Sequence, residues 1–359
     1  MSPLVRVLVV DDSASERKRL LALLAGEPRC VVVGEAADGV EALVKARNLR
    51  PDVITMDAEM PRLDGLLATE AIMAEAPARV LILCPVDKER NLDISFRAMA
   101  AGALEVIRKP PASAGEDEQR DWGRRLAETI VLMSEVPVVR RQRRPPAASP
   151  SLGHAGTMDF FALVASTGGP PALAQVLGAL PRSLPIPLLV AQHIARGFIG
   201  GLVRWLAAVS PLVIEVAADG ARALPGHVYL PPDGRDLELA FGGLLRTPAS
   251  TSLHCPSGNR LLHSLARICR SRAGAIVMTG MGDDGTEGLL ALRNAGGATF
   301  AQDESTSVVF GMPHAAHAGG AAESLLALEN VAPAILELCA VQMPHARGPR
   351  AHGETPPWK

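Results

Sequence analysis

Residues 5–12 read VRVLVVDD, a short apolar run that ends in two adjacent aspartates, Asp11 and Asp12. The same design returns where DVITM precedes Asp57 and where LEVIR precedes Lys109. Short apolar runs that alternate with helical segments are typical of parallel strands. Because the carboxyl ends of neighbouring parallel strands meet along one edge of a sheet, we expect the three aspartates and the lysine to converge.

This convergence predicts a phosphorylation site. Clustered carboxylates repel one another and need a cation, and Mg²⁺ prefers carboxylate and phosphate oxygens. A lysine beside them suits the oxygens of a phosphoryl group. Helix capping would explain one such acid, but not a pair, a third acid and a lysine at different strand ends. We therefore interpret the cluster as a phosphorylatable aspartate that controls the rest of the chain.

The composition limits the classes of protein to which this chain can belong. A length of 359 residues predicts two domains, and an apolar content of 48% supports sizeable cores. The formal charge of −2 and the aromatic content of 3% argue against a nucleic-acid partner. Five scattered cysteines indicate reduced thiols. No signal-peptide pattern is visible, and no stretch approaches the roughly 20 apolar residues that span a bilayer, so we expect a cytoplasmic protein without membrane insertion.

Two regions of strand and helix alternation predict two α/β domains. Residues 1–133 contain five strand-like runs separated by amphipathic stretches, which predicts a doubly wound parallel sheet. Proline and arginine dominate 134–157, which we interpret as an extended linker. Alternation returns at 158–343 and predicts a second doubly wound domain with a mostly parallel sheet, interrupted by an antiparallel stretch at 227–246. The polar segment 344–359 is expected to be a disordered tail.

The segments VLVVDDSASERKRL, VITMDAEMPRLDG and RKP resemble the flavodoxin-like receiver domains of response regulators. The resemblance implies that Asp57 accepts a phosphoryl group from a histidine kinase. It also implies that Asp11 and Asp12 bind Mg²⁺ together with Asp57, and that Lys109 neutralises the phosphoryl oxygens.

Two positions depart from the receiver pattern. Cys84 stands where receivers carry a serine or threonine that contacts the phosphoryl group, and a thiol is a weak donor. Val106 stands where receivers carry an aromatic side chain that changes rotamer. We expect phosphoryl acceptance to survive both changes, which leaves open the route from the phosphoryl group to the second domain.

A serine in the second domain lies at a predicted turn from strand to helix. The run FFALVAS ends at Ser166 and leads through Gly168 and Gly169 to Pro170. Glycines permit a sharp turn, and proline is favoured in the first turn of a helix. Free amides at the helix start would favour negative charge beside the hydroxyl. A helix-capping serine would explain this segment equally well.

Two further segments favour catalysis over capping. His193 ends the strand-like run PLLVAQH, and Asp283 and Asp284 lie in AGAIVMTGMGDDGTEG, again at a turn from strand to helix. A nucleophile, a base and an orienting acid on adjacent strand ends fit the geometry of a catalytic triad. The order of the three along the chain neither supports nor excludes this interpretation.

The segments VASTGGPPAL, AQHI, PGHVYLPP, MTGMGDDG and AQDESTSVVFGMP resemble chemotaxis protein-glutamate methylesterases. Together with the receiver segments, the resemblance extends from residue 4 to about residue 340. It implies that Ser166 is the nucleophile, His193 the general base and Asp284 the third member of the triad. It also implies an oxyanion-hole amide near Met281. The implied reactions, without a cofactor, are hydrolysis of glutamate methyl esters and deamidation of glutamine on methyl-accepting chemotaxis receptors.

The cleft departs from the family pattern at several positions, so the sequence specifies the chemistry more firmly than the substrate. The segment AQHIARGFIGGL lacks the usual proline after the histidine. Asp236 stands where the family usually carries a histidine. In the segment LHCPSGNRLL, Cys255 and Asn259 replace residues that the family usually carries.

Two alternatives stay open. GMGDDG at 280–285 fits the GxGxxG fingerprint of nucleotide-binding oxidoreductases. Against it, Asp283 and Asp284 would place two carboxylates beside a pyrophosphate, and the strand comes late in its domain. The other alternative is a non-catalytic protein in which the receiver controls binding of a partner, although Ser166, His193 and Asp284 are all present.

Overall fold

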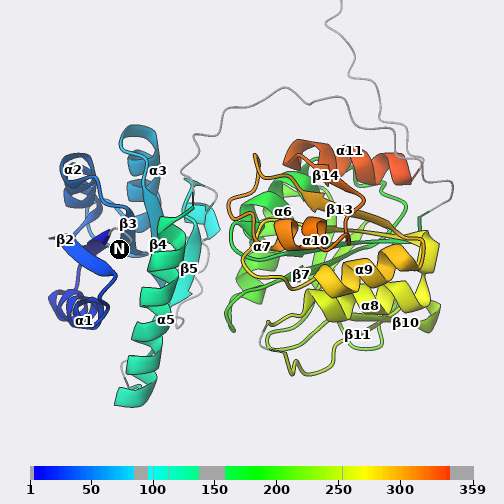
Figure 1. The fold of residues 1–359 in the computed structure, drawn as a ribbon, viewed down its shortest axis with the longest axis horizontal. Coiled ribbons are helices and arrows are strands. Elements are labelled where there is room, and N and C mark those ends of the chain that lie inside the picture. Colours follow the sequence, from blue (N-terminus) through cyan, green and yellow to red (C-terminus); the bar gives the residue numbers. More distant parts are fainter. Residues whose placement is uncertain are drawn as a thin grey trace, which may run out of the picture.

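The computed structural model describes residues 4–84, 96–99, 101–111, 113–136, 158–252 and 254–339. Most of the predicted linker and all of the predicted tail lie outside these residues. Figure 1 shows two α/β units, one formed by the first part of the chain and one by residues from 158 onward. No helix among the described residues is long and apolar enough to cross a membrane.

The N-terminal domain contains a five-stranded parallel sheet in the order β2-β1-β3-β4-β5, as expected from the sequence. Its strands are β1 (Val5–Val10), β2 (Cys30–Ala36), β3 (Val53–Asp57), β4 (Arg79–Cys84) and β5 (Glu105–Arg108). Apolar side chains bury one face of the sheet under α2 (Gly39–Leu49), α3 (Gly65–Glu75) and residues 96–99. The other face is buried under α1 (Ala14–Ala25) and α5 (Glu116–Ser134).

Side-chain caps stabilise the first turns of three of these helices. Ser13, Asp38 and Asp64 lie at the N-caps of α1, α2 and α3, and each side chain accepts a hydrogen bond from a backbone amide in the first turn. Such caps satisfy donors that have no partner within the helix. Asp11 and Asp57 do not cap these helices, which leaves their carboxylates for the edge of the sheet.

The second domain contains a seven-stranded parallel sheet in the order β14-β13-β12-β6-β7-β9-β8. Its strands are β6 (Phe160–Ala165), β7 (Leu188–Gln192), β8 (Val213–Val216), β9 (His227–Leu230), β12 (Ala273–Val277), β13 (Ala298–Gln302) and β14 (Ser324–Leu326). One face packs against α6 (Gly169–Gly178), α7 (Ile199–Val209) and α11 (Leu328–Leu338). The other packs against α8 (Gly258–Ile268), α9 (Thr286–Asn294) and α10 (Met312–Ala318).

The antiparallel prediction for residues 227–246 is correct for only part of that stretch. β10 (Glu238–Ala240) and β11 (Leu244–Arg246) pair antiparallel as a separate hairpin. β9, in contrast, runs parallel to β7 and β8 in the main sheet. Its residues 228–230 are buried, and the two prolines that follow at 231 and 232 end the strand before the hairpin begins. Burial in the main sheet therefore overrides the hairpin pattern.

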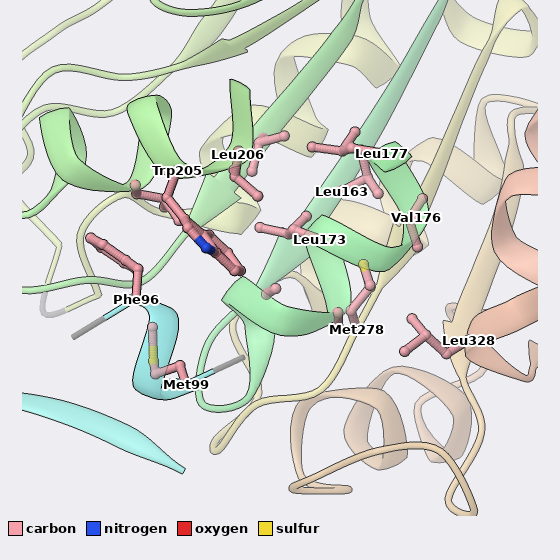
Figure 2. Packing of buried hydrophobic residues seen from close by; sticks show 14 of the residues in the cluster. Phe96, Met99, Leu163, Leu173, Val176, Leu177, Trp205, Leu206, Met278 and Leu328 are labelled. Atoms are coloured by element: carbon pink, nitrogen blue, oxygen red, sulfur yellow. The ribbon is translucent and has the colours of Figure 1, made fainter. Parts of the chain in front are cut away.

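An apolar cluster continues from the N-terminal domain into the second. The fully buried Phe96 ring stacks on Trp205 of α7 at a centroid distance of 5.9 Å. It also meets Phe198 edge-on at 6.4 Å. Figure 2 shows Phe96 and Met99 beside the Trp205 ring. Full burial of one such aromatic side chain contributes about 1.5–3 kcal/mol, so this contact stabilises the packing of the two domains.

The order of the second sheet places its topological switch point beside β6. From β6 the chain first adds β7, β8 and β9 on one side, and then returns to add β12, β13 and β14 on the other. In open parallel sheets, sites form at the carboxyl ends of strands where the chain reverses its direction of growth. The loops that follow β6, β7 and β12 are therefore expected to hold the functional groups.

Candidate active site

The register of β6 and β7 brings Ser166 beside His193. Ala165 pairs with Gln192, and the His193 amide donates a hydrogen bond to the Ala165 carbonyl at 2.9 Å. The Ser166 amide donates to the Thr279 carbonyl, which ties the serine to the loop after β12. Ser166, His193 and the loop after β12 therefore meet at the carboxyl ends of β6 and β7.

Close backbone approach around Ser166 requires glycine. A Cβ atom at Gly280 would lie 2.6 Å from the Ser166 Cβ. Gly168 has a φ of 74°, which favours glycine, and leads directly into α6. A Cβ at Gly169 would lie 2.0 Å from the side-chain oxygen of Gln192. These contacts explain why the serine turn and the GMGDDG loop are both rich in glycine.

Gln192 is a site residue that sequence reasoning missed. Its side chain is buried, and its Nε2 donates hydrogen bonds of 2.8 Å to the carbonyls of both Ser166 and His193. One amide group thus links the two strand ends that carry the nucleophile and the base. The sequence around Gln192 did not indicate this role, because an apolar strand pattern does not show whether a glutamine side chain bridges two strand ends.

Asp284 holds His193 in the geometry expected of a triad. The Asp284 Oδ2 atom lies 2.7 Å from His193 Nε2. The carboxylate is buried and also accepts hydrogen bonds from the amides of Gly258 at 2.6 Å and Asn259 at 3.0 Å. These amides begin α8, so the aspartate lies at a helix N-terminus that favours negative charge.

The surroundings of Asp284 lower its pKa. Burial by itself raises the pKa of this carboxyl, but the hydrogen bond and charge of His193 outweigh burial, together with the amides of Asn259 and Gly258. Asp284 is therefore ionised at neutral pH and favours a proton on the histidine Nε2. Nδ1 is then the ring nitrogen that keeps a free lone pair. In the described part of the chain, Ser166 Oγ makes no hydrogen bond to His193.

A second imidazole stacks on the ring of His193. The His254 ring stacks on the His193 ring with a centroid distance of 5.1 Å and an interplanar angle of 14°. His254 is exposed to solvent. An aromatic face beside a histidine that gains a proton stabilises the resulting cation. The sequence showed His254 only as part of a segment that departs from the family.

The Asn259 side chain accepts hydrogen bonds from backbone amides that a bound dinucleotide would need. Its Oδ1 accepts hydrogen bonds from Gly285 at 3.1 Å and Gly288 at 2.9 Å, at the start of α9. A pyrophosphate bound to a GxGxxG turn requires these helix-start amides. The buried carboxylate of Asp284 lies in the same turn. The structure therefore argues against the oxidoreductase alternative.

Asp236 has a structural role in the cleft. Its carboxylate is fully buried and accepts hydrogen bonds from the Ser257 amide at 2.8 Å and from Arg260 at 3.0 Å. Ser257 is the N-cap of α8. Asp236 thus helps to fix the start of the helix that binds Asp284. The amide of Met281, expected at the oxyanion hole, stays a prediction; the side chain is exposed beside the crevice.

In the N-terminal domain, Lys109 lies between two of the predicted acids. Its Nζ atom lies 2.7 Å from Asp11 and also contacts Asp57. Burial is the largest influence on Asp57 and raises its pKa to about 6, with Lys109 opposing and Asp11 and Asp12 adding to the shift. The pKa of Lys109 is raised because the two carboxylates outweigh its burial. Burial and Lys109 thus act in opposite directions on the charge of Asp57.

These oxygens have the chemistry that Mg²⁺ requires, since hard cations prefer carboxylate ligands. Asp11 and Asp57 are buried at the edge of the sheet, and Asp12 is exposed beside them. Within the described ranges, no group of three or more acidic, histidine or cysteine side chains is arranged to hold a metal. The three-aspartate ligand set and the Cys84 contact stay predictions. Cys84 itself is fully buried at the end of β4.

Glu105, at the start of β5, joins the two domains beside the nucleophile. Its Oε2 accepts a hydrogen bond of 2.9 Å from the Thr167 hydroxyl, on the residue that follows Ser166. Val308 lies against Gly168 and packs on apolar residues of the N-terminal domain. Sequence reasoning singled out neighbouring Val106 and missed Glu105, because an acidic residue at a strand start normally lies in solvent.

The fold and the site define a two-domain response regulator whose output domain is an α/β serine hydrolase. Comparison with known proteins agrees: the CheB methylesterase family matches residues 161–335, and the response regulator receiver domain matches residues 7–115. A protein-glutamate methylesterase/protein-glutamine glutaminase of Myxococcus xanthus (strain DK1622) is 52% identical over 335 residues, covering 93% of this chain and 94% of the relative.

A second such protein from the same organism is 43% identical over 337 residues, covering 91% of this chain and 95% of the relative. The crystal structure of the Thermotoga maritima CheB methylesterase catalytic domain is 33% identical and covers 51% of this chain and 100% of that chain, with a TM-score of 0.49. The chain belongs to the family of protein-glutamate methylesterases/protein-glutamine glutaminases.

Acidification tests the environment of Asp284. Because its folded-state pKa lies below the unfolded value, its stabilising contribution is complete above the ordinary aspartate pKa of about 3.9 and is lost as the pH falls through the folded value. We expect Asp284→Asn to lower the free energy of unfolding at pH 7 and to flatten its dependence on pH below about 4. Denaturant titrations at several pH values measure this. Asp283→Asn, an exposed neighbour, is the control, and an equally steep acid dependence in Asp284→Asn would contradict the assignment.

The stacked imidazole gives a kinetic prediction. We expect His254→Ala to lower kcat by roughly three- to tenfold with little change in KM, since an aromatic pair contributes about 0.5–1.5 kcal/mol. His254→Phe should restore most of kcat because it keeps the ring. His263→Ala, an exposed histidine on α8, serves as the matched control in steady-state assays. Equal losses in the Ala and Phe variants would show that the ring face plays no part.

Proposed function

We propose that this chain hydrolyses methyl esters of glutamate side chains on methyl-accepting chemotaxis receptors, and deamidates glutamine at the same positions. The observation that supports this most directly is the 2.7 Å contact between His193 and a buried, ionised Asp284, next to Ser166. Relatives with this reaction in their names match nearly the whole chain. The catalytic roles below are our assignments for this sequence.

In the proposed reaction, His193 takes the proton of the Ser166 hydroxyl as the oxygen attacks the ester carbonyl. Asp284 stabilises the imidazolium that forms and keeps the ring oriented. A backbone amide at Met281 donates to the oxyanion of the tetrahedral intermediate. The protonated His193 then gives its proton to the departing methanol, or to ammonia in deamidation. In the second half of the reaction, His193 takes a proton from water as the water attacks the acyl-serine. His193 then returns the proton to Ser166, and the product is a glutamate. No step requires a cofactor.

The receiver places this reaction under the control of phosphorylation. In our proposal a histidine kinase supplies the phosphoryl group in the cytoplasm, and Asp57 attacks phosphorus through its ionised carboxylate. Lys109 neutralises the transferred oxygens, and Cys84 lies where a hydroxyl would otherwise contact them. Asp11, Asp12 and Asp57 would hold Mg²⁺, which neutralises the charge of the incoming phosphate.

Methanol release tests the esterase. We expect the purified protein to release methanol from a methyl-esterified receptor fragment, and Ser166→Ala to lower the rate by on the order of a thousandfold or more, as for loss of a triad nucleophile. Ser271→Ala, an exposed serine of the same domain, should retain full activity. Equal methanol release by wild type and Ser166→Ala would disprove the assignment of the nucleophile.

Phosphoryl transfer tests the receiver separately. With Mg²⁺ and a small phosphodonor, we expect the wild-type chain to gain one phosphoryl group on Asp57, measured by intact mass. Asp57→Asn should gain none because an amide does not attack phosphorus. Asp64→Asn is the matched control, since asparagine also caps a helix and α3 should stay intact. A phosphoryl group on Asp57→Asn would place the acceptor elsewhere.

A further inference from the structure

Thr279 lies where three loops of the second domain meet. It follows β12, which is the strand between β13 and the β6 strand that leads to Ser166. Loops that follow neighbouring parallel strands meet along one edge of a sheet. The Thr279 side chain is fully buried there. A buried hydroxyl costs free energy unless it is hydrogen-bonded, so its partners show which segments this residue holds together.

The carbonyl and the hydroxyl of Thr279 both bind the turn that carries Ser166. The Thr279 carbonyl accepts a hydrogen bond of 3.0 Å from the Ser166 amide. The Thr279 hydroxyl donates a hydrogen bond of 2.9 Å to the carbonyl of Thr167, the residue after Ser166. Thr279 thus contacts the backbone on both sides of Ser166 and fixes the position of this turn relative to β12.

The same hydroxyl also binds the loop after β13. It accepts a hydrogen bond of 2.9 Å from the Val309 amide, and it lies 3.4 Å from the Val309 carbonyl. That carbonyl accepts a hydrogen bond of 3.0 Å from the Gly280 amide. The buried Gln302 accepts a hydrogen bond of 2.8 Å from the Thr279 amide and donates one of 2.8 Å to the Thr306 carbonyl. The amide, carbonyl and hydroxyl of Thr279 therefore each have a partner in another segment.

These contacts set the direction of the Met281 amide. The Gly280 carbonyl and the Met281 N–H belong to one trans peptide group, which is planar, so they point in opposite directions. The Gly280 carbonyl accepts hydrogen bonds from the amides of Gly311 at 3.1 Å and Met312 at 2.8 Å. A Cβ at Gly280 would lie 2.6 Å from the Ser166 Cβ. The peptide that carries the Met281 amide is therefore fixed on one side by the loop after β13, and it begins at a residue in close contact with Ser166.

We propose that Thr279 is a positioning residue whose hydroxyl fixes the spacing between Ser166 and the Met281 amide. This inference rests on the proposed function, in which that amide donates to the oxyanion of the tetrahedral intermediate. A fixed donor stabilises the charge that develops in the transition state and does so before the reaction begins. Its placement therefore affects kcat more than KM. Thr279 acts through the backbone of the two loops and contributes no reacting atom.

Thr299, on β13, provides a matched control. Its side chain is fully buried like that of Thr279, but among the residues that the structure describes its hydroxyl has no hydrogen-bond partner. Valine has nearly the same shape as threonine and lacks the hydroxyl, so the same substitution can be made at both positions. A loss of activity that appears only at residue 279 therefore results from the hydrogen bonds of that hydroxyl, and not from replacing a buried threonine.

Steady-state methanol release from a methyl-esterified receptor fragment tests the proposal in the full chain. We expect Thr279→Val to lower kcat by on the order of ten- to a hundredfold with little change in KM, because a small misplacement of catalytic groups can cost about a hundredfold. Thr279→Ser keeps the hydroxyl and should restore most of kcat. Thr299→Val should keep the wild-type kcat and KM.

A transition-state analogue tests whether the effect acts through the oxyanion. The probe is the receptor fragment with a trifluoromethyl ketone in place of the methyl ester. Ser166 Oγ adds to the ketone carbon, His193 takes the hydroxyl proton, and the ketone oxygen becomes the oxyanion. We expect the Ki of this probe to rise in Thr279→Val by the same factor by which kcat falls. A lower kcat with an unchanged Ki would overturn the proposal, because the hydroxyl would then not act on the oxyanion.

Three kinetic results would also overturn the proposal: a wild-type kcat in Thr279→Val, an equal loss in Thr279→Ser, or an equal loss in Thr299→Val. Absence of methanol release from the wild-type chain would instead overturn the proposed function. Circular dichroism of each variant confirms that both domains are folded. If Thr279→Val does not fold, Thr279→Cys replaces it, because a thiol fits the same space and is only a weak donor. A wild-type kcat in Thr279→Cys would then overturn the proposal.

Discussion

The buried carboxylate of Asp284 is the interaction on which the catalytic domain depends. A charge removed from water is costly unless it is paired and hydrogen-bonded, and here His193 and the first amides of α8 supply both. The N-cap Ser257 and the buried Asp236 position the start of that helix. The same interaction fixes the histidine ring, so structural stability and the orientation of His193 have one physical origin.

The receiver is part of the same arrangement and not a separate module. Phe96 continues one apolar core into the other domain, and Glu105 brings a carboxyl group to the turn that carries the nucleophile. Because β5 also leads into Lys109, the acidic cluster and the esterase crevice lie at two ends of one short strand. The strand thus joins the two sites without involving Cys84.

The sequence predicted the parts of the molecule that follow periodic rules. Alternating apolar runs gave both parallel sheets, and the strand-end positions of Ser166, His193 and Asp284 gave a site that the fold brings together. The antiparallel prediction was wrong for β9, because burial between β7 and β8 outweighed a local hairpin pattern. No sequence pattern indicated the contacts of Gln192, His254 or Glu105, because each side chain contacts a partner that is distant in sequence or lies on a neighbouring strand.

By itself, the sequence determined the fold class, and it predicted both the serine, histidine and aspartate at strand ends of the second domain and the acidic cluster of the receiver. Residue type and strand-end position are sufficient for these, because parallel strands place their carboxyl ends together. Only the tertiary structure decided that α8 stabilises Asp284, that Asn259 occupies the amides of the glycine-rich turn, and that Glu105 reaches Thr167. The Asp284 and Asn259 contacts join separate segments of the second domain, and the Glu105 contact joins the two domains, so their geometry arises only from tertiary packing.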